Sequence, residues 1–217
     1  MLLNRPVYLP KAVLLKVWEW EGHGSPPAVF GPDNYWLGDE TKKQYEDKVL
    51  DVLVGLGLGA GGTVTKEFRE VLRVLAQGTQ QFSAWLGSVE TDESAGTLVS
   101  VRGSDAVRLV RQDDRVRLDS VAVEYPAESL VGLLPPVPPV RMDPITVPNA
   151  RFGPRKPRAD EPYELKVSTG YAPPDPARRA KDLAAGKRSG VHQFYATKAG
   201  GRSKPLTVLT SSAKAGY

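Results

Sequence analysis

Short runs of β-branched and aromatic residues dominate the centre of the chain, and glycine, aspartate and serine separate them. This pattern predicts antiparallel strands joined by hairpins. In the last run Val116 and Leu118 alternate with charged residues, which is typical of a half-buried strand. Pro126 then opens a short predicted helix that ends before Pro135. The four predicted strands are Gln80–Val89, Thr97–Arg102, Ala106–Arg111 and Arg115–Val121.

Apolar residues at helical spacing predict further helices on both sides of this centre. These helices are Lys11–Trp20, Asp39–Leu56, a segment from Thr65 to Gly78, and Ala177–Ala185 behind Asp175 and Pro176. Other short runs predict additional strands at Ala28–Phe30, Ile145–Val147, Val191–Thr197 and Pro205–Thr210.

Part of this order occurs twice. A helix, Gln80–Ala84, a loop and Leu98–Val101 recur as a helix, His192–Ala196, a loop and Leu206–Leu209. An internal duplication predicts two lobes around a pseudo-two-fold axis that contribute strands to one sheet. The second copy is incomplete. If the chain ends at Tyr217, its last strand has an unpaired edge, and we expect low stability or self-association.

We therefore predict one α+β domain over residues 1–217, with a central antiparallel sheet flanked by helical bundles. Twelve of the 19 prolines lie between Pro135 and Pro176, which indicates a linker or an extended cover. The predicted parts are an N-terminal lobe (1–139), a proline-rich connection (140–176) and a shortened C-terminal lobe (177–217).

Composition limits the chemistry available to the chain. Its 217 residues contain no cysteine, which excludes disulfides, thiolate catalysis and cysteine-based zinc sites. No apolar run approaches the roughly 20 residues needed to span a bilayer, and the N-terminus does not resemble a signal peptide. These features predict a cytoplasmic protein.

Charge is distributed unevenly along the chain. The net charge of +4 combines −5 over residues 1–150 with +9 over residues 151–217. The basic third leaves two interpretations open, namely nucleic-acid binding or a solvated segment. Few aromatic residues are interleaved with these cations to stack on bases, which favours the second.

No catalytic or metal-binding pattern stands out. Gly57–Gly62 has the spacing G-x-G-x-x-G, but a helical pattern precedes it and no acidic residue follows about 20 positions later. We interpret it as a flexible turn between helices. His23 and His192 are the only histidines, and neither belongs to a ligand motif. Asp113 and Asp114 are typical of a hairpin turn. The sequence therefore predicts no enzyme, metal or cofactor.

Several stretches, in order, resemble the EspG family of secretion-associated proteins of ESX (type VII) systems. The N-terminal ones are Val17–Gly22, Pro26–Val29, Leu53–Leu58 and Phe68–Ala76. The later ones are Ala106–Val110, Arg115–Leu118, Leu133–Pro139, Ile145–Pro148, Gln193–Phe194 and Lys204–Val208.

The resemblance implies a quasi-two-fold α+β fold and a non-enzymatic cytosolic chaperone. Such a chaperone binds the helical tip of the PPE partner in a PE–PPE substrate, keeps it soluble and directs it to its secretion machine. It also implies that the loop between the second and third strands contacts the substrate. With Ala28–Phe30 as the first strand, the predicted partner-binding residues are Glu90, Thr91, Asp92, Glu93, Ser94, Ala95 and Gly96. An ordinary solvated hairpin is the alternative interpretation of this acidic loop.

Overall fold

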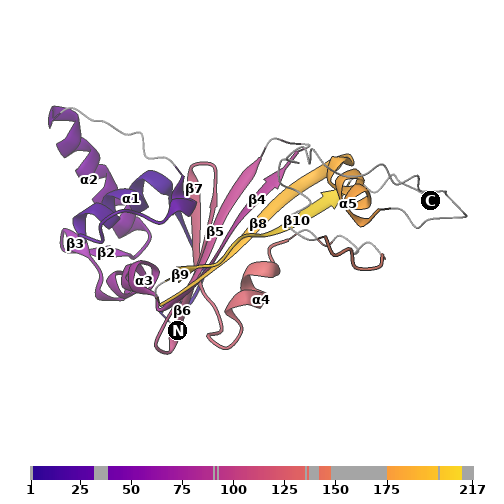
Figure 1. The fold of residues 1–217 in the computed structure, drawn as a ribbon. Helices are drawn as coiled ribbons and strands as arrows, with labels where there is room; N and C mark the ends of the chain where they lie inside the picture. The colour runs from indigo at the N-terminus through magenta and orange to yellow at the C-terminus, as the bar shows by residue number, and fades with distance from the viewer. Residues whose placement is uncertain are drawn as a thin grey trace, which may run out of the picture. The chain divides into compact units, whose positions relative to one another are not determined.

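An antiparallel sheet of eight strands forms the centre of the computed structural model (Figure 1). The structure describes residues 2–31, 39–89, 91, 93–134, 136, 142–147, 175–199 and 201–211. Two compact units divide the chain. One unit comprises residues 1–136 and 189–210, and the other comprises residues 137–188 and 211–217.

The strand order is β1-β7-β6-β5-β4-β8-β10, with β9 paired to β8. The strands are β1 (Val7–Pro10), β4 (Gln80–Ser88), β5 (Ser94–Arg102), β6 (Asp105–Gln112), β7 (Arg115–Ser120), β8 (Arg188–Lys198), β9 (Gly201–Arg202) and β10 (Leu206–Ser211). The four central predicted strands and both C-terminal ones are confirmed. Residues 142–147 contain no strand, so the one predicted at Ile145–Val147 was wrong.

The predicted helices are also present. They are α1 (Lys11–Trp20), α2 (Asp39–Gly55), α3 (Lys66–Gln77), α4 (Pro126–Val131) and α5 (Pro176–Ala185). Thr65 caps α3, since its hydroxyl accepts a hydrogen bond from the Phe68 N–H at 3.3 Å. Asp175 caps α5 through the Ala177 N–H at 3.1 Å.

Two predicted segments differ from the structure. Ala28–Phe30 is a 3₁₀ turn, η1, because the Phe30 N–H donates to the Pro27 carbonyl at 3.0 Å and folds the segment back on itself. The glycine-rich joint after α2 forms a small hairpin, β2 (Gly59–Ala60) and β3 (Thr63–Val64). A turn with Gly61 and Gly62 at positive φ connects these two strands.

The predicted duplication appears in the pairing of β4 with β8. Ser83 lies opposite Tyr195, its own counterpart in the repeat. Phe82 lies opposite Ala196, and Ala84 opposite Phe194, so each pair is the repeat image of the other. This register places the pseudo-two-fold axis between Ser83 and Tyr195. The fold is therefore α+β, with the two repeats contributing strands to one antiparallel sheet.

Helices cover the two faces of the sheet to different extents. On the first face, cross-strand neighbours such as Leu118, Leu109 and Leu98 pack with residues of α1, η1, α2 and α3. We call this cluster the first-face core. On the second face, the second-face core consists of Ala84, Val99, Leu130 of α4 and Phe194.

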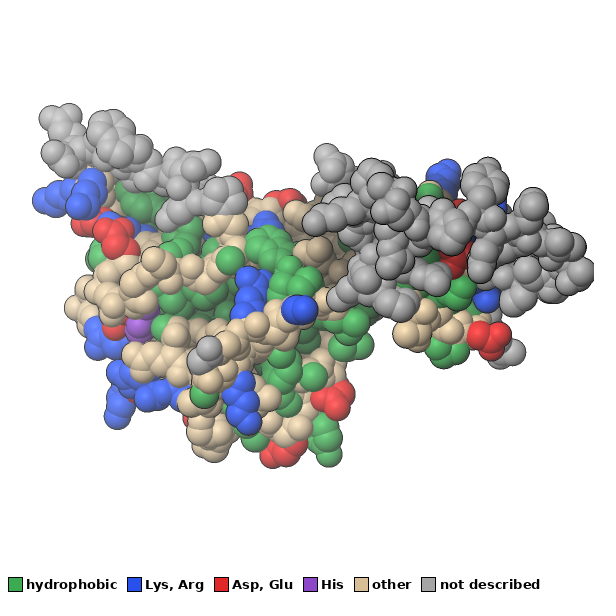
Figure 2. Space-filling model, viewed as in Figure 1, with side chains coloured by type: hydrophobic (Ala, Val, Ile, Leu, Met, Phe, Trp, Pro, Cys, Tyr) green, Lys and Arg blue, Asp and Glu red, His purple; other side chains and the backbone are tan. Residues whose placement is uncertain are grey.

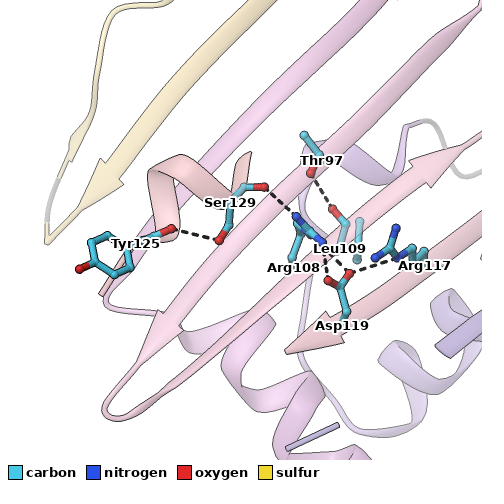
Figure 3. Close-up of polar contacts among 7 residues, drawn as sticks. All are labelled: Thr97, Arg108, Leu109, Arg117, Asp119, Tyr125 and Ser129. Atoms are coloured by element: carbon cyan, nitrogen blue, oxygen red, sulfur yellow. Dashed lines mark hydrogen bonds and ion pairs between the residues drawn. The ribbon is translucent and has the colours of Figure 1, made fainter. Parts of the chain in front are cut away.

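A polar network attaches α4 to the second face (Figure 3). Arg108 of β6 makes an ion pair with Asp119 of β7 at 2.5 Å and donates to the Ser129 carbonyl of α4 at 2.8 Å. Arg117 lies 3.4 Å from the same carboxylate. Because the side chains of Arg108 and Asp119 are largely buried, each compensates the other's desolvation while α4 is held in place.

Candidate functional site

The predicted partner-binding loop lies at the turn from β4 to β5. The Ser88 N–H donates to the Glu93 carbonyl at 2.9 Å, and the Thr91 N–H donates to the Ser88 hydroxyl at 3.3 Å. Thr91 and Glu93 are exposed, whereas Glu90 and Asp92 lie outside the described residues. The turn thus presents at least one acidic side chain to solvent.

Three of the predicted loop residues belong to a strand instead. Ser94, Ala95 and Gly96 begin β5, because β5 pairs with β4 from Ser94 onward. Ser94 is exposed, Ala95 is partly buried and Gly96 is buried. The loop is therefore shorter than its sequence suggested.

A close contact, rather than an unusual backbone conformation, explains why position 96 is a glycine. A Cβ atom at this position would lie 2.4 Å from the carbonyl oxygen of Val29 in η1. The same oxygen accepts a hydrogen bond from Arg111 Nε at 2.8 Å. The missing side chain therefore lets η1 approach the sheet next to the loop.

β8 lies beside the loop, because its first residues form hydrogen bonds with the end of β4 from which the loop begins. The Val89 N–H donates to the Ser189 carbonyl at 2.8 Å, just beyond the last pair of the β4–β8 ladder. Residues of the loop and of the second repeat therefore share one end of the sheet, although they are far apart in the sequence.

Half-buried aromatic and polar side chains lie on the first face of β4 and β8. We call this group the aromatic strip: its half-buried members are Trp85, Gln193 and Tyr195, and the exposed Arg202 of β9 also belongs to it. The Arg202 guanidinium lies 3.7 Å from the centre of the Tyr195 ring, and the Tyr195 hydroxyl donates to Gln193 Oε1 at 3.1 Å. The buried Arg111 lies 5.8 Å from the Trp85 ring.

The strip combines apolar area with hydrogen-bonding groups. Aromatic rings of this kind provide large contact area with little loss of side-chain entropy, and polar groups at their edges can still form hydrogen bonds. In the space-filling view, hydrophobic and basic side chains lie side by side over the strands (Figure 2). Such a surface fits a protein partner better than a small molecule, which needs a concave pocket.

The sequence analysis did not identify the aromatic strip. The signal was present, because Trp85 and Tyr195 alternate with the buried residues Ala84 and Phe194 along their strands. An aromatic residue on the less buried face of a strand is a candidate for binding. Only the pairing of β4 with β8 brings the two aromatic residues to one surface.

The candidate catalytic residues do not form a site. Within the described part of the chain, no group of three or more His, Asp and Glu side chains is arranged to hold a metal. Asp113 and Asp114 occupy the β6–β7 turn, with Asp113 at a φ of 50°. Helix α2, rather than a strand, precedes the glycine-rich segment, so the context of a dinucleotide fingerprint is missing.

The two histidines lie at separate places, His23 partly buried and His192 buried. Burial lowers the pKa of His23 and of His192 below the ordinary value of 6.5. His23 packs against Trp18, with ring centres 5.1 Å apart. His192 lies on β8, 5% exposed, and neither of its ring nitrogens has a hydrogen-bond partner.

Residues 151–174, 200 and 212–217 of the basic C-terminal third lie outside the described residues. Among the described cations, Arg202 stacks on Tyr195 within the aromatic strip. Helix α5 carries Arg178, Arg179 and Lys181, with Asp182 beside them.

Comparison with known proteins adds a family and a fold. The model of the EspG family matches residues 10–213. A solved structure of the Mycobacterium tuberculosis type VII secretion system chaperone EspG5, in complex with a PE25–PPE41 dimer, is similar with a TM-score of 0.57 and 11% identity. The match covers 96% of this chain and 84% of that one. No curated protein sequence matches. None of the described helices is both long and apolar enough to cross a bilayer.

Proposed function

Because the chain belongs to the EspG family, we propose that it is a chaperone of a type VII secretion system. It binds the helical tip of a PPE protein in a PE–PPE pair, keeps that tip soluble in the cytosol and directs the pair to its secretion machine. The observation that carries the proposal is the family match over residues 10–213, together with a fold shared with a chaperone solved on a PE–PPE dimer.

The surface formed by β4 and β8 supports this assignment. A helix tip exposes apolar side chains and unpaired backbone carbonyl or amide groups. The aromatic strip offers rings for the former and hydrogen-bonding side chains, such as Gln193, for the latter. Glu93 and the other loop acids then meet polar or basic groups around the tip. They act on orientation and association rate more than on affinity.

The proposed role requires binding and no chemical step. Turnover of substrate is therefore not expected, and affinity for a folded partner is the property to measure.

Co-expression provides the main test. The chain is expressed with PE–PPE pairs, purified, and washed at about 0.1 M and about 1 M salt. We expect one stoichiometric complex that survives high salt, because apolar burial supplies most of its affinity. Nucleic acid that co-purifies and is lost at high salt would instead support the alternative, since phosphate contacts weaken steeply with ionic strength. Absence of a complex with any pair would contradict the proposal.

The loop is tested by charge reversal. Asp92→Lys/Glu93→Lys changes the loop from acidic to basic, and we expect the association rate to fall roughly tenfold. Asp47→Lys/Asp51→Lys makes the same charge change at exposed positions of α2 and serves as the matched control. Unchanged kinetics in the loop variant, with an intact fold, would exclude the loop from the interface while leaving the family assignment intact.

A further inference from the structure

One row of residues crosses the first face of the sheet from the aromatic strip toward η1. Gln193 of β8 lies opposite Trp85 of β4, and Trp85 lies opposite Gly96 of β5. Gly96 in turn lies opposite Arg111 of β6. The glycine places no side chain between the other two, and the Arg111 guanidinium lies over the Trp85 ring, 5.8 Å from its centre. The row therefore connects a half-buried ring of the strip with a buried cation.

Arg111 is held in turn by the backbone of η1. Its side chain is 8% exposed, and its Nε donates to the Val29 carbonyl oxygen at 2.8 Å. Val29 is itself buried and belongs to the first-face core. A guanidinium is a rigid planar group, and a desolvated cation is attracted to an indole face more strongly than an exposed one. Arg111 therefore limits the orientations open to the Trp85 ring.

We propose that Arg111 is a positioning residue of the partner-binding surface, which holds the Trp85 ring in the orientation that the partner meets. This inference rests on the proposed function, because Trp85 belongs to the aromatic strip. Arg111 is buried, so it acts through Trp85 rather than by contact with the partner. A side chain that is ordered before binding loses less conformational entropy in the complex, and this preorganisation raises affinity.

A double-mutant cycle tests the role, with a PE–PPE pair that co-purifies with the unmodified chain. Arg111→Met keeps an unbranched stem but removes the charge and the donor. It should raise the dissociation constant roughly two- to tenfold, the cost of ordering one side chain in the complex. In a Trp85→Ala background, which itself weakens binding, the same substitution should leave the dissociation constant unchanged, because no ring remains to be held.

Two further variants separate positioning from folding. Arg108→Met is the matched control, since Arg108 is also a largely buried arginine of β6 but lies on the second face and pairs with Asp119. It should lower stability and leave affinity unchanged. Arg111→Gln keeps a donor for the Val29 carbonyl and removes only the charge over the ring. It covers the possibility that Arg111→Met disturbs the fold, and it should show the same coupling to Trp85.

A measurement on the free chain needs no partner. In fluorine NMR of the fluorotryptophan-labelled protein, with the Trp85 signal assigned by Trp85→Phe, that signal should shift and broaden in Arg111→Met and Arg111→Gln but not in Arg108→Met.

The outcomes distinguish the two proposals. If no PE–PPE pair binds the unmodified chain, the proposed function is wrong. If a pair binds, the positioning role is wrong when the folded Arg111 variants leave the Trp85 signal or the affinity unchanged. It is equally wrong when they weaken binding to the same extent with and without Trp85, or when Arg108→Met weakens binding as much as they do.

Discussion

The two faces of the sheet bury very different amounts of apolar side chain. Among the described residues, the first-face core contains 22 buried apolar residues and the second-face core contains four. Full burial of one large aliphatic side chain contributes about 1.5–3 kcal/mol. The first face therefore supplies most of the hydrophobic stabilisation of this unit.

The first face itself is divided along the sheet. Over β5, β6 and β7 its side chains are covered by α1, η1 and α3, whereas over β4 and β8 Trp85, Gln193 and Tyr195 remain half-buried. Stability and the proposed recognition thus depend on different strands of one sheet. Substitutions in the covered part should change folding, and those in the open part should change binding.

The largest expected effect comes from shortening a core leucine. Leu72 of α3 is 0% exposed, and Leu72→Ala should lower the free energy of unfolding by about 3–5 kcal/mol, because it removes contacts on every side. Leu130→Ala, in the smaller second-face core, should cost about 2 kcal/mol, since the short helix α4 can shift to fill the space. Urea unfolding of both variants measures the difference. Equal losses would contradict the proposed contrast between the faces.

A smaller effect is expected where η1 approaches the sheet. Gly96→Ala would place Cβ 2.4 Å from the Val29 carbonyl oxygen, so β5 and η1 must separate. We expect a loss of about 1–3 kcal/mol, typical of overpacking. Gly87→Ala is the matched control on β4, because its Cβ would lie 3.3 Å from the nearest atom, the Val191 oxygen. Similar thermal transitions for the two variants would show that the close approach of η1 does not require a glycine at position 96.

Local pattern predicted the central strands and the capped helices because their determinants lie within a few residues. Thr65 and Asp175 each accept a hydrogen bond from an N–H two or three positions later. β1 was missed because four residues carry little periodicity, and this strand depends on distant pairing, such as Leu9 with Val116. Ala28–Phe30 has a strand-like composition, but its local hydrogen bonds make a 3₁₀ turn.

The position of the acidic turn was predicted, but its extent was wrong. The acidic turn after β4 was found, yet its last three residues belong to β5. The reason for Gly96 lies in Val29, which no local pattern connects to it. The aromatic strip requires β4 and β8 to be neighbours. The internal repeat suggested a shared sheet, but the register with Ser83 opposite Tyr195 needed the structure.

The smallest expected effect is the pH dependence of the free energy of unfolding, to which one histidine on each face of the sheet contributes. His192 lies on the second-face side of β8, two residues before Phe194, and His23 packs on Trp18 of the first-face core. Burial lowers the pKa of both below 6.5 in the folded chain, whereas the unfolded chain binds protons near the ordinary pKa. The unfolded state therefore binds more protons as pH falls below about 6.5, and stability decreases from there toward the lower folded pKa.

His192→Leu should remove its part of this decrease, because an apolar side chain suits the buried position and does not titrate. His23→Leu should remove the other part, and the double variant should have a nearly flat urea midpoint between about pH 7.5 and about pH 5.5. Constant ionic strength keeps the ion pairs comparable across the series. If His192→Leu retains the full pH dependence of the unmodified chain, its imidazole is protonated in the folded state, and its burial does not limit stability in acid.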